Sequence, residues 1–509
     1  MHGTSRFSVT SATIRGAEAI PVTVEVIVSS GMPGVSIVGM ADTAIHEARE
    51  RVRAALKSCN LQLPGEKIVF NLAPGSIKKS GSGFDLPMAV ALLAATGQIP
   101  TDYLANKMIV GELSLDGAIK PVQGLVAYQM CAFEQGMDLI CAPCYNALSK
   151  TAENYVVYGA RNLRSFIEGD FEIGKKPEQQ SQTELLDYAD VGGHRLAKRA
   201  LQIAAAGNHG LLMMGPPGSG KTMLAKRLPS ILPQLNPHEI AESASIASIA
   251  GEQIDSLLMG ARPFRAPHHS ATLAGLIGGG SPVRPGEVSL AHNGVLMLDE
   301  LPEFSHSVLQ GLRQPIEEGK VSITRADGNV VMPAKFMLIA ASNPCPCGYY
   351  GDDRVECTCL PSRVNSYQNK IGGPLIDRFD MSIDVWRSDF DDVITGDAEF
   401  SSATLKSGVE SARAFAFERF KHQDSNPSNN TAVFSMMQQC SMDNLTQKLF
   451  KKLAQKYVLS GRGILRVLRV ARTIADIEQS ISVTEDHIAE ALMLRMRTTS
   501  SQNVQKESA

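Results

Sequence analysis

The spacing of hydrophobic positions changes along the chain and predicts a first α/β region. Short β-rich runs such as Val22–Val28 alternate with helical patterns such as Thr43–Cys59. This alternation predicts an α/β domain over residues 1–172. The run GKKPEQQSQT, residues 174–183, is polar and lacks bulky apolar side chains, so we expect a linker over residues 173–189.

A second alternating pattern predicts another α/β domain over residues 190–388. Three strand-like runs lie in it, separated by helical segments: Gly210–Met214, Gly294–Leu298 and Phe336–Ala341. That spacing is typical of a parallel sheet. Helical periodicity dominates residues 389–497, which we expect to form a lid, and residues 498–509 have the polar composition of a flexible tail.

Composition narrows the functional classes. The 509 residues include 49 Lys and Arg against 52 Asp and Glu, so the net charge of −3 provides no general attraction for nucleic acid or membranes. The longest apolar run, Leu86–Ala95, is far shorter than the roughly 20 residues that span a bilayer. With no secretory signal pattern at the N-terminus, we expect a soluble, cytoplasmic protein. The nine cysteines then favour metal binding or free thiols over disulfides.

The run GPPGSGKT is a complete phosphate-binding loop between an apolar strand and a helical segment. Its glycines allow backbone N–H groups to surround phosphate oxygens, and the helix that follows directs its positive end at them. We expect Lys221 to reach the β and γ phosphates of ATP and Thr222 to bind Mg²⁺. The predicted ATP-binding residues of this loop are Gly215, Pro216, Pro217, Gly218, Ser219, Gly220, Lys221 and Thr222.

Two further strand ends predict hydrolysis rather than nucleotide binding alone. The run GVLMLDE ends in Asp299 and Glu300. We expect Asp299 to bind Mg²⁺ and Glu300 to act as the base that polarises the attacking water. The next strand ends in Asn343, whose amide is a candidate for positioning that water, although a strand-end Asn is also common in turns.

Arginines after the third strand are candidates for stabilising transition-state charge. Arg378 follows a helical segment, where it could reach the γ phosphate of a neighbouring subunit, or pair with Asp377 or Asp380 on the surface. A later helix carries arginines three or four residues apart. We expect Arg466 or Arg469 to reach the nucleotide from the helical lid.

Four cysteines lie close together in the sequence, within residues 344–361. They form two C-x-C pairs separated by nine residues: Cys345, Cys347, Cys357 and Cys359. Four thiolates can complete a tetrahedral zinc site, which leaves no open position and is therefore structural. Free thiols are the alternative, because the spacing is not the commoner C-x-x-C form.

These elements, in this order, resemble an AAA+ ATPase, and the run GEVSLAHNGVLMLDELP resembles the magnesium chelatase branch. The runs DVGGHRLAKRALQIAAAG, RPFRAPHHS and SNPCPCGYYGD are similar to the ComM (YifB) family over nearly the whole chain. The resemblance implies a hexameric ring that uses ATP to drive branch migration of recombining DNA during natural transformation. It implies single-stranded and branched DNA, and possible recombination proteins, as partners, and identifies Arg378 as an arginine finger.

Two basic segments are candidates for touching a DNA backbone in such a ring. The first is a long insertion with a Gly-rich run and Arg262, Arg265 and Arg284. The second is a predicted hairpin, Lys320–Arg325 paired with Val330–Lys335 through an Asp-Gly turn. Its candidate DNA contacts are Lys320, Arg325 and Lys335. Ordinary solvated charges and ion pairs are an equally good explanation for both segments.

The first domain resembles the C-terminal fold of Lon protease, a ribosomal S5 domain 2-like architecture, which raises ATP-dependent proteolysis as a rival function. A serine activated by a lysine is needed for that chemistry. Gly83 stands where the nucleophile is expected, with Ser80 and Ser82 nearby, and Val126 replaces the lysine. We therefore interpret the domain as a former protease fold. A magnesium chelatase-type remodelling ATPase is a further alternative.

Overall fold

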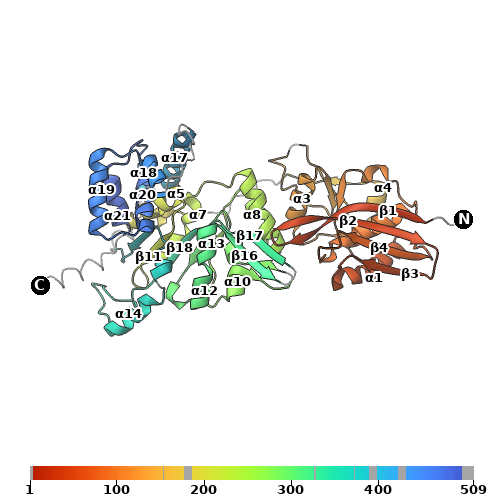
Figure 1. The fold of residues 1–509 in the computed structure, drawn as a ribbon, viewed down its shortest axis with the longest axis horizontal. Coiled ribbons are helices and arrows are strands. Elements are labelled where there is room, and N and C mark those ends of the chain that lie inside the picture. The colour runs from red at the N-terminus through yellow and green to blue at the C-terminus, as the bar shows by residue number, and fades with distance from the viewer. Residues whose placement is uncertain are drawn as a thin grey trace.

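The computed structural model describes residues 4–152, 154–176, 186–281, 283–325, 328–371, 373–388, 398–421 and 432–495. Three parts follow one another along the long axis in chain order (Figure 1). A sheet-containing unit lies at the N-terminal end, a second lies in the middle, and helices form the other end. Most of the predicted linker and the predicted tail lie outside the described residues.

The first unit contains an eight-stranded sheet in the order β10-β9-β8-β5-β1-β2-β4-β3. Its long hairpin, β1 (Ser5–Arg15) and β2 (Glu18–Ser29), pairs with β4 (Lys67–Ala73). Helix α2 (Asp85–Ala95) has every residue but Ala95 buried, so it is a core helix. The other strands and helices are β3 (Gly34–Val38), β5 (Lys107–Ile109), β8 (Asp138–Cys141), β9 (Val157–Gly159), β10 (Glu172–Ile173), α1 (Thr43–Ser58), α3 (Leu125–Glu134) and α4 (Leu163–Glu168). A two-stranded pair, β6 (Glu112–Leu113) and β7 (Ile119–Lys120), completes the unit.

The central unit contains a five-stranded sheet in the order β12-β15-β18-β11-β19. All neighbouring strands are parallel, which confirms the predicted parallel sheet. Its strands are β11 (Leu211–Met214), β12 (Phe264–Arg265), β15 (Val295–Leu298), β18 (Met337–Ser342) and β19 (Met381–Asp384). Because parallel strands share one direction, the loops after their carboxyl ends meet at one edge.

Short helices and two hairpins surround this sheet. The helices are α5 (Arg195–Gly207), α6 (Lys221–Lys226), α7 (Leu228–Ile231), α8 (Pro237–Ala250), α9 (Asp255–Leu258), α10 (Leu273–Ile277), α11 (Glu287–Leu290), α12 (His306–Gly311), α13 (Arg313–Glu318), α14 (Pro361–Asn369) and α15 (Gly373–Ile376). One hairpin pairs β13 (Gly278–Gly279) with β14 (Arg284–Pro285). The other pairs β16 (Lys320–Arg325) with β17 (Gly328–Pro333). The second strand of this hairpin begins two residues before the predicted Val330 and ends at Pro333 rather than Lys335. The next pair in the same register, Gly319 and Ala334, is still joined by a hydrogen bond from Ala334 N to Gly319 O of 2.8 Å.

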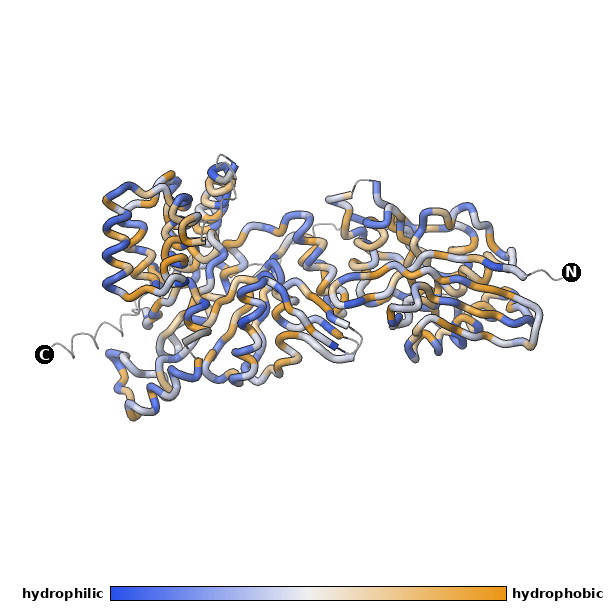
Figure 2. Tube along the Cα trace, viewed as in Figure 1, coloured by the Kyte–Doolittle hydropathy of each residue, from blue (hydrophilic) through white to orange (hydrophobic). Residues whose placement is uncertain are grey.

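The helical part shares a hydrophobic core with the central sheet. It comprises α17 (Ser402–Lys421), α18 (Ala432–Cys440), α19 (Asn444–Lys456), α20 (Gly461–Ile477) and α21 (Glu485–Met493). In α20, Val467 and Leu468 belong to the same buried cluster as Leu211 and Met213 of β11. Hydrophobic and hydrophilic turns alternate along these helices in Figure 2, as amphipathic packing requires. The lid is therefore anchored to the sheet by buried side chains.

Helix α8 connects the central unit to the first unit. Gly124 N donates to Ser248 O at 2.9 Å, and Ser245 Oγ lies 3.3 Å from Ala17 O. Ala17 also packs in a buried cluster with Val330 of hairpin β16–β17. The first unit thus contacts both a helix and a hairpin of the central unit. No helix in the described residues is long and apolar enough to cross a membrane.

Candidate functional site

The predicted phosphate-binding loop lies between strand β11 and helix α6, at the carboxyl edge of the central sheet. Gly215 is required there because a Cβ would lie 2.0 Å from Val385 O, after the neighbouring strand β19. Lys221, the first residue of α6, folds back over the loop. Its Nζ donates to Gly215 O at 2.8 Å and to Pro216 O at 2.9 Å. The amine therefore lies inside the loop that would surround phosphate oxygens.

The ends of β15 and β18 bring further predicted residues to the same edge. Thr222 Oγ1 donates to Asp299 Oδ2 at 2.7 Å, so the two candidate Mg²⁺ ligands are adjacent. Asn343, after β18, has its Oδ1 3.3 Å from Lys221 Nζ. Glu300 follows Asp299 directly and its side chain is 54% exposed. Five predicted residues thus surround one place where a nucleotide and a metal would fit.

Burial changes the protonation chemistry of the loop lysine. It lowers the pKa of Lys221 to about 8, while the Asp299 carboxylate opposes the shift. A charged amine without a phosphate partner is costly in a buried position. Bound phosphate oxygens would supply the missing negative charge, so nucleotide binding and protonation of Lys221 should be coupled.

His269 is a residue of this site whose role sequence reasoning missed. Its Nδ1 lies 3.3 Å from Glu300 Oε2, and its ring stacks on His268 with ring centres 4.0 Å apart. Both histidines line a pocket with Thr222 and Asp299. The loop that carries them follows β12, a neighbour of β15 in the parallel sheet. The run RPFRAPHHS marked these histidines as part of the family resemblance, but β12 has only two residues, so the sequence did not show that they follow a strand of this sheet.

Arg378 lies at the opposite edge of the sheet from the phosphate loop of its own chain. It stands just before β19, and Asp380 N donates to Gly210 O at 3.0 Å, at the amino end of β11. Four residues of β11 span about 13 Å between the two edges. The Arg378 side chain is 8% exposed, with Nη2 2.7 Å from Glu317 Oε1. Glu317, which the sequence analysis did not name, is therefore a carboxylate partner of Arg378 in this structure.

The two candidate lid arginines also lie at that opposite edge. Arg466 Nε is 3.4 Å from Asp380 Oδ1. Arg469 lines a cavity with His209 and Asp380. The helices that carry them pack at the amino end of β11, away from the phosphate loop of the same chain, and the expectation that Arg466 or Arg469 reaches a nucleotide stays a prediction.

The four predicted zinc ligands come together in the fold. Their sulfur atoms all lie within 4.8 Å of one another, with Cys345–Cys347 and Cys347–Cys357 separations of 3.3 and 3.5 Å. Tetrahedral Zn–S bonds of about 2.3 Å place sulfurs about 3.8 Å apart, so the donor set fits zinc. Hydrogen bonds from backbone amides, first that of Tyr349, lower the pKa of Cys347 to about 6. The pKa values of Cys345, Cys357 and Cys359 are raised, with burial among the causes, so the thiolate is favoured at Cys347 alone while no metal is bound.

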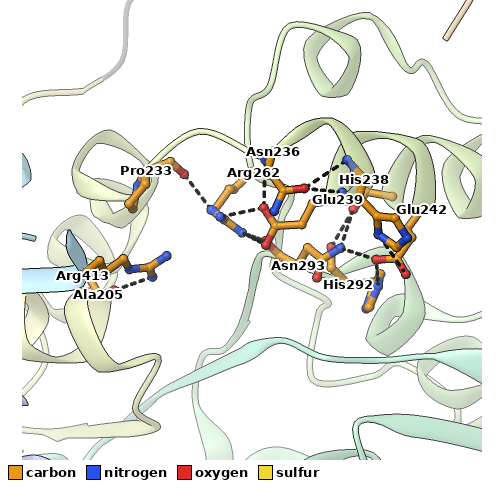
Figure 3. Close-up of polar contacts among 11 residues, drawn as sticks. Ala205, Pro233, Asn236, His238, Glu239, Glu242, Arg262, His292, Asn293 and Arg413 are labelled. Atoms are coloured by element: carbon orange, nitrogen blue, oxygen red, sulfur yellow. Dashed lines mark hydrogen bonds and ion pairs between the residues drawn. The ribbon is translucent and has the colours of Figure 1, made fainter. Parts of the chain in front are cut away.

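Arg262, a predicted DNA contact, is instead part of the interior framework. Its guanidinium donates to Pro233 O at 2.7 Å and to Asn293 O at 2.6 Å, and it pairs with Glu239 at 3.1 Å. Figure 3 shows the side chain surrounded by these three residues. The Arg262 side chain is 11% exposed. These contacts within the chain engage the guanidinium, and the expectation that Arg262 touches DNA stays a prediction that they do not support.

Arg265 is likewise engaged within the chain. Its Nε lies 2.7 Å from Glu287 Oε2, and its Nη1 lies 2.8 Å from Glu252 Oε2. Two carboxylates that are distant in sequence therefore neutralise one guanidinium. The prediction that Arg265 contacts DNA likewise stays a prediction that these ion pairs do not support.

The remaining predicted DNA contacts are exposed: Arg284, Lys320, Arg325 and Lys335. The two hairpins that carry three of them lie side by side. Arg325 Nη2 is 3.6 Å from the position that a Cβ on Gly279 would occupy, and Ile323 Cδ1 is 3.4 Å from that of Gly278. The Gly-rich turn and the basic hairpin thus form one continuous surface.

The rival protease site has no lysine base in the described residues. Val126 is 1% exposed in a hydrophobic cluster. The Ser82 hydroxyl donates to the Glu112 carboxylate, and the Lys79 amine donates to Pro74 O. The hydrogen bond of Ser82 goes to a carboxylate and not to the lysine amine that a serine–lysine protease uses to activate its nucleophile. The interpretation of this unit as a former protease fold stays a prediction.

Family models of magnesium chelatase match three parts of the chain. The model described as "Magnesium chelatase, subunit ChlI" matches residues 187–393. "Subunit ChlI of Mg-chelatase" matches residues 24–146, and "Magnesium chelatase, subunit ChlI C-terminal" matches residues 399–495. All three parts of the fold are therefore similar to the same kind of protein.

Similarity to individual proteins extends over nearly the whole chain. The chain is 39% identical over 490 residues to YifB of Escherichia coli, covering 94% of this chain and 95% of that protein. It is 38% identical over 491 residues, with the same coverage, to the competence protein ComM of Haemophilus influenzae. The magnesium-chelatase 67 kDa subunit of Chlorobaculum parvum is 29% identical over 162 residues, 31% of this chain and 24% of that subunit.

Proposed function

The chain belongs to the ComM/YifB family of magnesium chelatase-like AAA+ ATPases, and on that premise we propose that it is a DNA motor. It would hydrolyse ATP to drive branch migration of recombining DNA during natural transformation. The name of the Haemophilus relative supports a role in competence. The proposal that the chain hydrolyses ATP rests on one observation: Lys221, Thr222 and Asp299 lie together at one edge of the central sheet.

Each residue of this edge has a role in the proposed reaction. Thr222 and Asp299 would hold Mg²⁺, which neutralises charge on the β and γ phosphates. Lys221 binds the same phosphates through its amine. Glu300 accepts a proton from the attacking water, and Asn343 positions that water through its amide. Glu300 must first leave His269, 3.3 Å away, before it can orient water.

A ring assembly, proposed as a hexamer, explains why three arginines lie far from their own phosphate loop. Arg378, Arg466 and Arg469 are at the amino edge of the sheet. In a head-to-tail ring this edge of one chain can face the nucleotide of the next. Arg378 would then exchange Glu317 for the γ phosphate and stabilise transition-state charge, as an arginine finger does.

The surface formed by hairpins β13–β14 and β16–β17 is the proposed DNA contact. It exposes Arg284, Lys320 and Arg325 beside a glycine-rich turn. Side chains of this kind bind phosphates without reading base sequence. Such binding suits a motor that must move along single-stranded and branched DNA, with or without other recombination proteins.

The cluster of Cys345, Cys347, Cys357 and Cys359 would hold one structural zinc ion beside the proposed ATP site.

ATP turnover measured with and without a forked duplex tests the proposal. We expect DNA to stimulate turnover, a Holliday-type substrate to be migrated, and light scattering to report a ring in the presence of nucleotide. The variant Lys221→Ala should abolish turnover and migration. Mixing it with Arg378→Ala should restore part of the turnover, because a mixed ring contains intact shared sites. The proposal would be contradicted if the protein stayed monomeric with and without nucleotide and its ATP turnover did not respond to DNA. Digestion of casein by the purified protein would also contradict it.

A further inference from the structure

The loop that contains the four cysteines packs directly on the phosphate-binding loop. It begins two residues after Asn343, at the end of β18, and β18 pairs with β11, which leads into the phosphate loop. Gly348 is the point of contact. A Cβ on this residue would lie 2.5 Å from Pro217 Cδ and 2.6 Å from Pro217 Cγ. Only a residue without a side chain allows the two loops to approach this closely.

Arg387 joins the same two loops from a third segment. Its Nη2 donates to Pro217 O at 3.2 Å, and its Nη1 lies 3.7 Å from Asp352 Oδ2 in the cysteine loop. The guanidinium also lies over the ring of Tyr349, 5.7 Å from its centre. One arginine thus holds the backbone of the phosphate loop and two residues of the cysteine loop.

The cysteine cluster itself orients the residues of this contact. Tyr350 N donates to Cys345 Sγ at 3.3 Å, and Gly348 N donates to Cys345 O at 3.0 Å. Tyr350 then lines a small cavity with Gly215 at the start of the phosphate loop. The four sulfurs define where the 345–359 backbone turns, because the loop contains no regular helix or strand. Whatever holds the sulfurs together therefore determines where Gly348 and Tyr350 press on the phosphate loop.

We propose that zinc bound by the four cysteines sets the conformation of the phosphate-binding loop, so that the metal content of the chain controls its affinity for nucleotide. This inference rests on the ATP site of the proposed function and adds a metal-dependent control to it. Without zinc, the loop that carries Gly348 loses its cross-link and stops supporting Pro217. Nucleotide binding should weaken, while Asp299 and Glu300, the residues of hydrolysis, stay in place directly after β15.

The first experiment follows zinc and nucleotide together on the full chain. Zinc per chain is measured by atomic emission, and affinity is measured by titration with a fluorescent ADP in excess Mg²⁺. A zinc-selective chelator should lower both, and added Zn²⁺ should restore both. Native protein without zinc, or stripped protein with unchanged ADP affinity, overturns the inference. Native protein that binds zinc but no ADP overturns the proposed ATP site instead.

Two glycine variants separate this coupling from general damage to the fold. Gly348→Ala keeps all four thiols but forces a methyl group against Pro217, and overpacking of this size should weaken ADP binding about tenfold. Gly351→Ala is the matched control. Gly351 has a similar φ of 81° against 88°, but its Cβ would lie 3.5 Å from Trp386 and not against the phosphate loop.

Both alanine variants bear the same backbone strain, so their difference reports the contact with Pro217. We expect wild-type zinc content in both and weaker ADP binding in Gly348→Ala alone. Arg387→Ala should also retain zinc and bind ADP more weakly. The inference is overturned if the Gly348→Ala and Gly351→Ala variants bind ADP with equal affinity. It is also overturned if Gly348→Ala binds ADP as tightly as the wild type, whatever its zinc content.

Discussion

Nucleotide binding should draw a proton onto Lys221, and the structure allows the size of this effect to be worked out. The side chain is 7% exposed and its pKa is lowered from 10.5 to about 8. That shift corresponds to about 3.4 kcal/mol against the charged amine. In free protein, about 0.9 of the Lys221 amines are therefore neutral at pH 9 and about 0.1 at pH 7.

Phosphate oxygens beside the amine favour its charged form and raise the pKa of Lys221 again. ADP binding should then take up about 0.9 protons at pH 9 and about 0.1 at pH 7, if the bound pKa returns to its ordinary range. The sign follows from the direction of the shift. Affinity should be nearly constant below pH 8 and fall by up to about tenfold per pH unit above it.

Calorimetric titration with ADP in buffers of different ionisation enthalpy measures this uptake directly. ADP avoids turnover during the titration. Lys226→Ala is the control, since Lys226 lies on the same helix and lines the adjacent pocket but makes no hydrogen bond to the phosphate loop among the described residues. It should retain the uptake. An uptake at pH 9 no larger than that at pH 7 would refute the argument from burial.

Three further predictions test the catalytic edge and the basic surface. Glu300→Gln should bind ADP normally but lower ATP turnover by about 10²- to 10⁴-fold, as loss of a general base does. His269→Ala should raise turnover without DNA about two- to fivefold, because the half-exposed contact of His269 with Glu300, with a free energy of up to about 1 kcal/mol, no longer competes for the carboxylate. His268→Ala should leave that turnover unchanged. Arg265→Ala should lower the free energy of unfolding by about 2 kcal/mol without a specific loss of DNA affinity. Arg325→Ala should instead weaken DNA binding at low salt. It should change the free energy of unfolding by less than about 0.5 kcal/mol.

Local sequence was sufficient for most of the fold because the relevant signals lie within short segments. The helix predicted at Thr43–Cys59 is α1, which ends one residue earlier, and the predicted hairpin strand Lys320–Arg325 is β16 without change. The phosphate loop is equally local, since strand, loop and helix follow one another directly. Parallel pairing then brought Asp299 and Asn343 to the same edge, as strand-end positions predict.

Charge pairing was decided only by the tertiary structure. Arg262 and Arg265 have the same sequence character as exposed Arg284, yet their partners Glu239 and Glu287 come from α8 and α11. Whether a guanidinium is free for DNA depends on which carboxylates the fold brings within hydrogen-bonding distance. No periodicity or motif encodes that information.

The sequence by itself determined that this chain has a phosphate loop, an acidic strand end and four clustered thiols, because each is a pattern of neighbouring residues. Only the tertiary structure decided that Arg378 and Arg466 face away from their own phosphate loop, and that Gly348 rests on Pro217. The physical reason is that the direction in which strands run and the packing of distant loops depend on the whole core. Hydrogen bonds and turns between adjacent residues form largely independently of it.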